Sequence, residues 1–160
     1  MKTGVAAPVT AFVALGANLG NAARSVEQAV GAIDALPRTR ITRRSSLYQS
    51  APVDAAGPDY VNAVIEISTG LPAAELLAAL QRIEEASGRE RPYRNAPRTL
   101  DLDVLLFGDR RIDTPTLTIP HPRMGERAFV LLPLAEIAPY LVSAAQLQAV
   151  ASQRIEKLPR

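Results

Sequence analysis

Alternating apolar and polar positions predict four β-strands along the chain. The run VTAFVALG at 9–16 is β-branched and aromatic, and the turn-like segment GANLGN follows it. YVNAVIEIST at 60–69 alternates at every second residue, and TLDLDVLLFG at 99–108 places leucines and a valine beside two aspartates. ITRRSSLYQS at 41–50 is more polar, so we expect a strand with one exposed face.

Apolar residues at helical spacing predict helices between these strands. AARSVEQAVGAIDALP at 22–37 is expected to begin at Asn18 or Asn21 as N-cap and to stop at Pro37. LPAAELLAALQRIEEASG at 71–88 carries a leucine stripe and closes on a glycine. Further along, we expect a short helix in 129–141 ahead of its prolines, and a last helix within 143–158.

The resulting order, β-α-β-β-α-β with extra helical pieces, predicts an α+β, ferredoxin-like antiparallel sheet with helices on one face plus C-terminal helical additions. With 160 residues the chain suits a single domain over residues 1–160. Many unrelated functions use this fold, so the fold alone does not decide the chemistry.

Composition narrows the possible chemistry. The formal net charge is only +2, but sixteen of the eighteen cationic residues are arginines, a residue suited to bidentate contacts with phosphate. The absence of cysteine excludes disulfides, thiolate metal sites and a cysteine nucleophile. The N-terminal apolar run is interrupted by Pro8 and Thr10, which argues against a secretory signal, and we expect a cytoplasmic protein.

The tripeptide DLD contains the first candidate site. Asp101 and Asp103 share one face of their strand, about 7 Å apart, while the flanking leucines share the other face. Two carboxylates at this spacing suit Mg²⁺, which is typically held by one or two carboxylates together with substrate phosphates. The pair could equally be part of a solvated sheet face or pair with Arg98.

The loop before these aspartates favours the metal site. Arg89, Arg91, Arg94 and Arg98 fall within ten residues of one another. Arginines around a metal would offer a polyphosphate both metal bridging and charge-assisted hydrogen bonds. The segment GANLGN lacks the lysine and hydroxyl residue of a P-loop, so such a nucleotide would have to be held by arginines and metal.

Three further residues could bind a ligand. His121, the only histidine, lies between two prolines, where we expect a rigid exposed turn from which it could donate a hydrogen bond to a phosphate. Tyr60 and Asn62 share one strand face and could seat a flat heterocycle with donor and acceptor edges, although these two residues alone favour ordinary cross-strand packing with a hydrogen-bonded asparagine.

The spaced set VALGANLGN, APVDAAGPDYVNAV, QRIEEASGRER, PRTLDLDVLLFG and IPHPRMGERAFVLLPLAEIAP resembles the 6-hydroxymethyl-7,8-dihydropterin pyrophosphokinases of folate biosynthesis. The resemblance runs in order over residues 10–140. It implies a ferredoxin-like fold and a Mg²⁺-dependent diphosphotransferase that moves the terminal pyrophosphate of ATP to the hydroxymethyl group of the dihydropterin and releases AMP.

The resemblance also implies roles for individual residues. Asp101 and Asp103 would hold two Mg²⁺ ions, and Arg89 and Arg98 would join them as catalytic residues. The ATP-binding positions implied by the match are Gln81, Glu84, Arg89, Arg91, Arg98, Val104, Thr118, His121 and Arg127. The implied pterin-binding positions are Ser50, Ala51, Val53, Tyr60, Asn62 and Phe129, the last by stacking. Asn95 stands where a tryptophan is frequent, and Ser50-Ala51 replaces a frequent Thr-Pro.

Two alternatives stay open. The same carboxylate pair could serve another Mg²⁺-dependent phosphoryl or nucleotidyl transferase, or a phosphohydrolase. A ferredoxin-like sheet next to a basic loop could instead bind RNA, although the chain has only 4% aromatic residues. We expect a monomer that acts on ATP and the dihydropterin, without nucleic acid or membrane partners.

Overall fold

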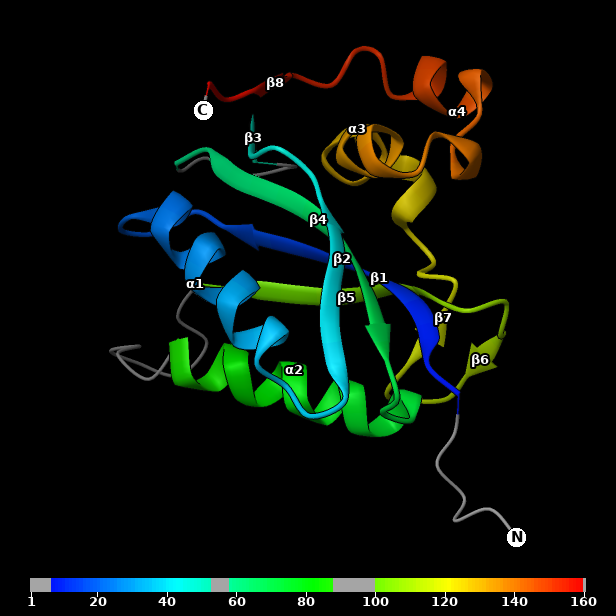
Figure 1. Ribbon diagram of the computed structural model, residues 1–160. Coiled ribbons are helices and arrows are strands. Elements are labelled where there is room, and N and C mark those ends of the chain that lie inside the picture. The colour runs from blue at the N-terminus through cyan, green and yellow to red at the C-terminus, as the bar shows by residue number, and fades with distance from the viewer. Residues whose placement is uncertain (1–6, 53–57, 88–99, 160) are drawn as a thin grey trace, which may run out of the picture.

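The computed structural model describes residues 7–52, 58–87 and 100–159, and its centre is one antiparallel sheet (Figure 1). The strand order is β5-β1-β4-β3-β8, and β2 pairs with the same central strand, β4, as β3 does. The strands are β1 (Val9–Ala17), β2 (Thr39–Arg44), β3 (Tyr48–Ser50), β4 (Tyr60–Thr69), β5 (Asp101–Phe107) and β8 (Ile155–Lys157).

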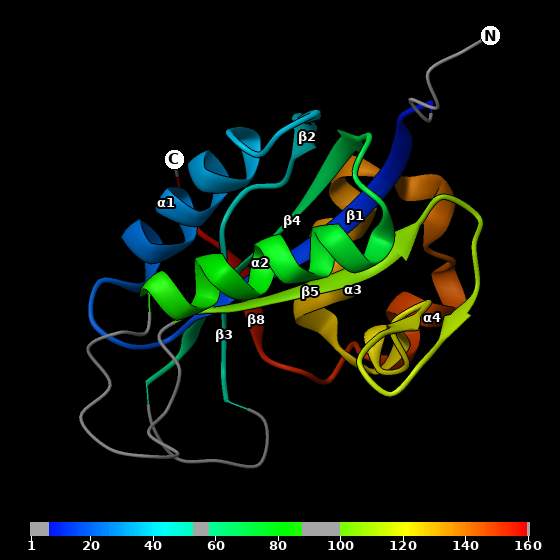
Figure 2. The same ribbon diagram turned by 90° about the horizontal axis from the view of Figure 1, so that it is seen from below.

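Helices lie on both faces of this sheet. The helices α1 (Ala22–Asp34) and α2 (Ala73–Ser87) cover one face, and Figures 1 and 2 show α3 (Ala128–Ile137) on the other, with α4 (Ala144–Ala149) beyond it. The pair α1 and α2 with strands β1 to β5 forms the ferredoxin-like unit, and the C-terminal elements are added to its second face. The predicted fold class is confirmed.

Alternation along β4 explains how one strand serves both faces. Ala63, Ile65 and Ile67 belong to the core under α1 and α2, whereas Val64 belongs to the smaller core under α3. Each fully buried aliphatic side chain of this kind stabilises the fold by roughly 1.5–3 kcal/mol. The side chains of β4 therefore hold three layers together.

The start of α1 follows the predicted capping chemistry. Of the two candidate caps, Asn21 is the one used, because its side-chain oxygen accepts a hydrogen bond from the backbone N–H of Arg24 at 3.1 Å. The preceding Gly20 has a φ of +59°, a conformation that glycine adopts without a steric penalty.

The predicted strand at 41–50 is wrong in its continuity, because the structure divides it into β2 and β3. Ser45 causes the break: its hydroxyl donates to the carbonyl of Ser46 and accepts from the backbone N–H of Val64. A serine side chain that bonds to nearby backbone groups competes with the regular ladder in this way.

The prediction of a short helix ahead of Pro133 is also wrong, since α3 runs through Pro133 to Ile137. Proline in a helix interior removes one backbone hydrogen bond. Here Pro133 is buried along with Leu131 and Leu134, so apolar packing against the sheet outweighs the local penalty.

The C-terminal segment differs most from its prediction. Instead of one helix within 143–158, a six-residue helix with a capping box between Ser143 and Gln146 is followed by β8, which pairs with β3. The remaining short elements are β6 (Ile112–Asp113), β7 (Thr118–Ile119) and the 3₁₀ turns Met124–Glu126 and Pro139–Leu141. None of the helices in the described ranges has the length and apolarity needed to cross a bilayer.

Candidate active site

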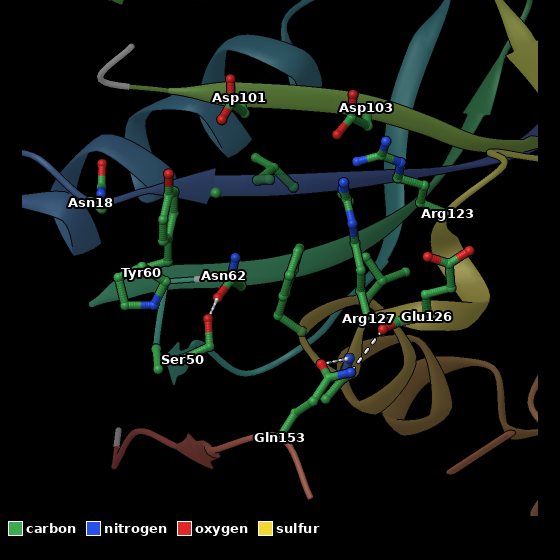
Figure 3. Close-up of a pocket in the computed structure, with 18 of the residues that line it drawn as sticks. Asn18, Ser50, Tyr60, Asn62, Asp101, Asp103, Arg123, Glu126, Arg127 and Gln153 are labelled. Atoms are coloured by element: carbon green, nitrogen blue, oxygen red, sulfur yellow. Dashed lines mark hydrogen bonds between the residues drawn. The ribbon is translucent and has the colours of Figure 1, made fainter. Parts of the chain in front are cut away.

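A pocket of about 700 Å³ opens on the α3 face of the sheet (Figure 3). Strands β1, β4 and β5 form its floor, the start of α3 forms one wall, and the C-terminal segment closes the side near β3. Its lining residues are Ala14, Leu15, Gly16, Asn18, Ser50, Ala51, Pro52, Tyr60, Asn62, Asp101, Asp103, Arg123, Glu126, Arg127, Ala128, Phe129, Val130, Gln153 and Arg154.

Strand register brings the predicted metal and pterin residues together. Gly16 of β1 pairs with Asp101 on one side and with Asn62 on the other, so these three residues form one row across the sheet. In the next row, Ala14 lies between Asp103 and Val64. The middle strand thus contributes only small residues between the carboxylates and the amide.

Gly16 keeps this row open. A Cβ at this position would lie 3.1 Å from Nδ2 of Asn62 and 4.0 Å from a ring carbon of Tyr60. The first distance is too close for an undisturbed contact. The hollow above β1 therefore depends on the absence of a side chain at Gly16.

The two aspartates project into the pocket side by side, as the alternation of β5 predicts (Figure 3). Leu100 and Leu102 point to the opposite face and are buried in the core under α1 and α2. Between the aspartates, the backbone N–H of Leu102 donates to Glu84 Oε2 at 2.7 Å. A charge-assisted bond from α2 thus holds the edge of the strand that carries the carboxylates.

His121 lies beside the carboxylates rather than on the exposed turn that was predicted. Its Nε2 is 4.0 Å from Asp103 Oδ1, and its side chain is only 20% exposed. Its Nδ1 accepts a hydrogen bond from the backbone N–H of Arg123, so the neutral ring carries its proton on Nε2. Burial lowers the pKa of His121, and the nearby Arg127 and Arg123 lower it further, against the opposing charge of Asp103.

The oxygen atoms that this site offers to a metal ion fit the coordination that Mg²⁺ prefers. Asp101 and Asp103 offer oxygen ligands at the pocket surface, and within the described part of the chain no three acidic, histidine or cysteine residues gather into a protein-only metal cage. Mg²⁺ usually keeps several waters and takes one or two carboxylates together with substrate phosphates. Two adjacent carboxylates in an open pocket meet that requirement.

Asn62 lies at the other end of the row with its orientation fixed. Ser50 donates its hydroxyl to Oδ1 of Asn62 at 2.6 Å, and both residues are buried. With the oxygen occupied, the Nδ2 group faces the pocket as a donor (Figure 3). Tyr60 lies next to Asn62 along β4 and completes a surface with one ring and one amide.

The opposite wall contributes an aromatic ring and cations. Phe129 lies in the first turn of α3, and the guanidinium of Arg127 lies 5.4 Å from its ring centroid. Arg123 extends from the turn before α3 toward Asp103 of β5 (Figure 3). The pocket is therefore lined by two arginines as well as by its two carboxylates.

Among the predicted ATP-binding residues that the structure describes, only Arg127 lines the pocket. Glu84 and His121 border the outer edge of β5, where the N–H of His121 donates to the carbonyl of Leu105. Gln81 is exposed on α2 and Thr118 is exposed on β7. The Val104 side chain is buried in the core, so this residue could offer a ligand only its backbone.

Some predicted residues lie outside the described ranges. These are Val53 of the pterin set and Arg89, Arg91 and Arg98 of the nucleotide and catalytic sets. Arg94 and Asn95 of the same loop also lie outside.

Sequence reasoning did not identify several pocket residues as part of the site. Gln153 and Arg154 lie in a segment for which no role was predicted, and neither belongs to a recognisable motif. Arg123 also belongs to none of the predicted sets of site residues. Gly16 had a detectable signal, because a glycine inside an otherwise apolar strand marks a place where a ligand or another chain segment approaches closely.

Comparison with known proteins identifies relatives of this chain. The profile of the family 7,8-dihydro-6-hydroxymethylpterin-pyrophosphokinase (HPPK) matches residues 12–139. A 2-amino-4-hydroxy-6-hydroxymethyldihydropteridine pyrophosphokinase of Pseudomonas aeruginosa is 48% identical over 131 residues, which cover 81% of each chain. An enzyme with the same name in Haemophilus influenzae is 47% identical over 135 residues, covering 84% of each chain.

Solved structures support the fold. The chain superimposes on the wild-type HPPK-DHPS of Plasmodium falciparum with pterin and p-hydroxybenzoate at a TM-score of 0.63 and 15% identity. It superimposes on an HPPK-DHPS in complex with substrates at a TM-score of 0.63 and 13% identity. These matches cover 82% and 87% of this chain, but the chain spans only about two fifths of the length of those proteins, 40% and 41%.

Proposed function

The chain belongs to the 7,8-dihydro-6-hydroxymethylpterin-pyrophosphokinase family, and we propose that it transfers the terminal pyrophosphate of ATP to the hydroxymethyl group of 6-hydroxymethyl-7,8-dihydropterin, with release of AMP. The main structural support for this proposal is the row formed by Asp101, Gly16 and Asn62 across three strands. This row places a candidate site for metal and phosphate beside a candidate site for a heterocycle in one pocket.

The metal side of the proposal assigns Mg²⁺ to Asp101 and Asp103, with two ions expected. Held by these two carboxylates, Mg²⁺ would supply positive charge that neutralises the phosphates of the substrate. Arg123 and Arg127 line the same pocket, and Nε2 of His121 lies 4.0 Å from Asp103 Oδ1 at the outer edge of β5. These groups would contact the negative charge of a triphosphate by charge-assisted and neutral hydrogen bonds.

The pterin side of the proposal assigns the ring to the hollow above Gly16. The Asn62 Nδ2 group would donate to an acceptor on the ring edge, while Phe129 and Tyr60 would supply aromatic contacts. Ser50 would act on the pterin indirectly, because its hydroxyl bond fixes which way the Asn62 amide faces. The backbone of Ala51, at the same rim, belongs to this side of the pocket.

The reaction requires alignment more than a strong base. The hydroxymethyl oxygen attacks the β-phosphorus and its proton passes to solvent, the bond from that phosphorus to the α,β-bridging oxygen breaks, and AMP departs with that oxygen. Positioning and charge neutralisation supply most of the catalysis in such transfers. A pocket with carboxylates at one end of a row and an oriented amide at the other would align the two substrates for this attack.

The nucleotide would occupy the outer edge of β5, between α2 and His121. Glu84 and His121 border that edge, while Gln81 is exposed on α2 and Thr118 is exposed on β7. We further propose that residues 1–160 form a single catalytic domain that works as a monomer in the cytoplasm, where ATP is available. The support for a monomer is that one chain supplies both the carboxylates and the pterin-facing residues of the pocket.

A substrate-omission assay tests the proposed function. The wild-type protein is incubated with ATP and Mg²⁺, with or without hydroxymethyldihydropterin, and AMP and ADP are separated by chromatography. AMP should form only when the dihydropterin and Mg²⁺ are both present. ADP formation, or AMP formation without the dihydropterin, would favour the alternative of a different transferase or a phosphohydrolase.

A further inference from the structure

We infer that Gln153 is a positioning residue of the active site: its side-chain amide holds the turn from which Arg127 and Phe129 enter the pocket. The structural part of this inference stands on the contacts of Gln153 alone, and only its kinetic consequence rests on the proposed function. Residue 153 lies beyond residues 12–139, the part matched by the family profile.

The turn before α3 lacks a cap of its own. The N-cap residue, Arg127, makes no side-chain capping bond, because a guanidinium has only donors and cannot accept from the helix N–H groups. The first N–H groups of any helix have no partner inside the helix and must find one elsewhere. At α3 that partner comes from a segment twenty-five residues further along the chain.

Gln153 satisfies the backbone on both sides of Arg127. Its Oε1 accepts from the N–H of Ala128 at 2.9 Å, and its Nε2 donates to the carbonyl of Glu126 at 2.8 Å (Figure 3). One side chain thus holds two backbone groups that flank a single residue. This double contact restricts the direction in which the Arg127 side chain leaves the backbone.

Only a side chain with both an acceptor and a donor at this reach can make the two bonds. A carboxylate accepts but does not donate, so glutamate at 153 would keep the bond to Ala128 and place an oxygen against the carbonyl of Glu126. Alanine would remove both bonds. Gln153→Ala therefore tests the loss of both hydrogen bonds. Gln153→Glu tests the repulsion between two oxygens at a nearly unchanged side-chain size.

The segment that carries Gln153 is anchored on the other side of the pocket. Its neighbour Arg154 pairs with Asp59 at 3.0 Å, directly before Tyr60, and the carbonyl of Arg154 accepts from the N–H of Ala51 at 3.3 Å. The following strand β8 then pairs with β3. Gln153 thus connects the start of α3 to a segment that is anchored beside β3 and β4. This connection sets the width of the pocket between α3 and those strands.

The exposure of Gln153 makes the inference testable without unfolding the protein. Gln153 is exposed, and the core around Leu131 and Val150 does not include its side chain. Replacement should therefore leave the global stability within about 1 kcal/mol of wild type. A matched control is Gln148, an exposed glutamine on α4 outside the pocket lining.

The experiment compares Gln153→Ala and Gln153→Glu with the control Gln148→Glu. We expect KM for the dihydropterin to rise roughly three- to tenfold in Gln153→Ala and at least as much in Gln153→Glu, because each lost hydrogen bond is worth a few-fold in an equilibrium. The kcat value should change less than KM, and Gln148→Glu should match wild type. Wild-type KM in both Gln153 variants would overturn the inference.

A measurement without substrate separates this inference from the proposed function. Amide hydrogen exchange at Ala128, followed by NMR, should accelerate roughly fivefold in Gln153→Ala and stay unchanged in Gln148→Glu. Unchanged exchange at Ala128 would contradict the positioning role even if the enzyme assay succeeds. Faster exchange in a protein without the proposed activity would leave the role of Gln153 intact and reject only the reaction.

Discussion

Asp101 and Asn62 lie on opposite sides of Gly16 in the strand register, and the space between them exists because Gly16 has no side chain. The chemistry of the pocket therefore depends on an absent side chain as well as on its charged residues. Ser50 also determines the chemistry of the pocket, because its hydroxyl fixes the direction in which the Asn62 amide points.

The change Gly16→Ala tests this role of Gly16. The new methyl group would meet Asn62 Nδ2 at 3.1 Å, so the amide must shift or the strands must separate. We expect KM for the dihydropterin to rise about tenfold, which is the effect of losing roughly 1.4 kcal/mol of binding.

The matched control is Gly31→Ala in the middle of α1, where an added Cβ meets no atom within 4 Å. This replacement should leave KM unchanged and raise the free energy of unfolding by up to about 1 kcal/mol, because alanine favours a helix. Equal KM values for Gly16→Ala and wild type would show that the pterin does not occupy the row.

At the scale of whole elements, hydrogen bonds that Glu136 accepts link helix α3 to the strands on its side of the sheet. Tyr48 donates its hydroxyl to Glu136 at 2.7 Å, and Ser46 donates both its backbone N–H and its hydroxyl to the same carboxylate. Burial raises the pKa of Tyr48, and the hydrogen bond and charge of Glu136 raise it further. The carboxylate thus joins α3 to the connection between β2 and β3.

This cluster predicts a particular dependence of stability on pH. Burial alone would raise the pKa of Glu136, but the bonds from Tyr48 and Ser46, with the charge of Lys157, lower it overall. A carboxyl whose pKa is lowered by folding stabilises the native state fully above its unfolded pKa, near 4.3, and loses this contribution as the pH falls through the folded pKa.

The test is denaturant unfolding of wild type and Glu136→Gln across pH 3–7. Because Glu136 is exposed and solvent screens its charge, we expect the variant to be less stable near neutral pH by at most about 1 kcal/mol, with the difference shrinking below roughly pH 4. Glu85→Gln, an exposed position on α2, serves as the control. A difference that is constant over this pH range would reject the assigned role of the Glu136 charge.

The elements also show where sequence reasoning succeeds and where it stops. The strand at 60–69 and the facing of Asp101 and Asp103 follow from strict alternation, a local property that the structure preserves. The helix through Pro133 and the strand β8 follow from packing against distant segments. No local pattern around Gln153 could indicate that it caps a helix twenty-five residues earlier.

At the scale of the whole molecule, the two faces of the sheet have different tasks. One face, under α1 and α2, carries the main core, and the other is divided between the core under α3 and the pocket.

This division also bears on the RNA-binding alternative. Sheet-based RNA modules stack bases on exposed aromatic residues, but here Phe12 is buried under α3 and the Tyr48 hydroxyl bonds to Glu136.

We therefore expect no appreciable binding of single-stranded RNA. A labelled oligonucleotide should show no anisotropy change with micromolar protein at about 0.15 M salt, although weak electrostatic binding is expected at low salt. Micromolar affinity that persists at the higher salt would support the RNA-binding alternative.

The most direct test of the account is the effect of the carboxylate pair on dihydropterin-dependent AMP formation. Asp101→Asn and Asp103→Asn keep the side-chain size but remove the negative charge proposed to hold Mg²⁺, and Asp113→Asn on the exposed hairpin strand β6 is the control. Each pocket variant should lose at least about a hundredfold in kcat at saturating ATP, while the control keeps wild-type activity. Near-wild-type AMP formation in Asp101→Asn and Asp103→Asn would contradict the account.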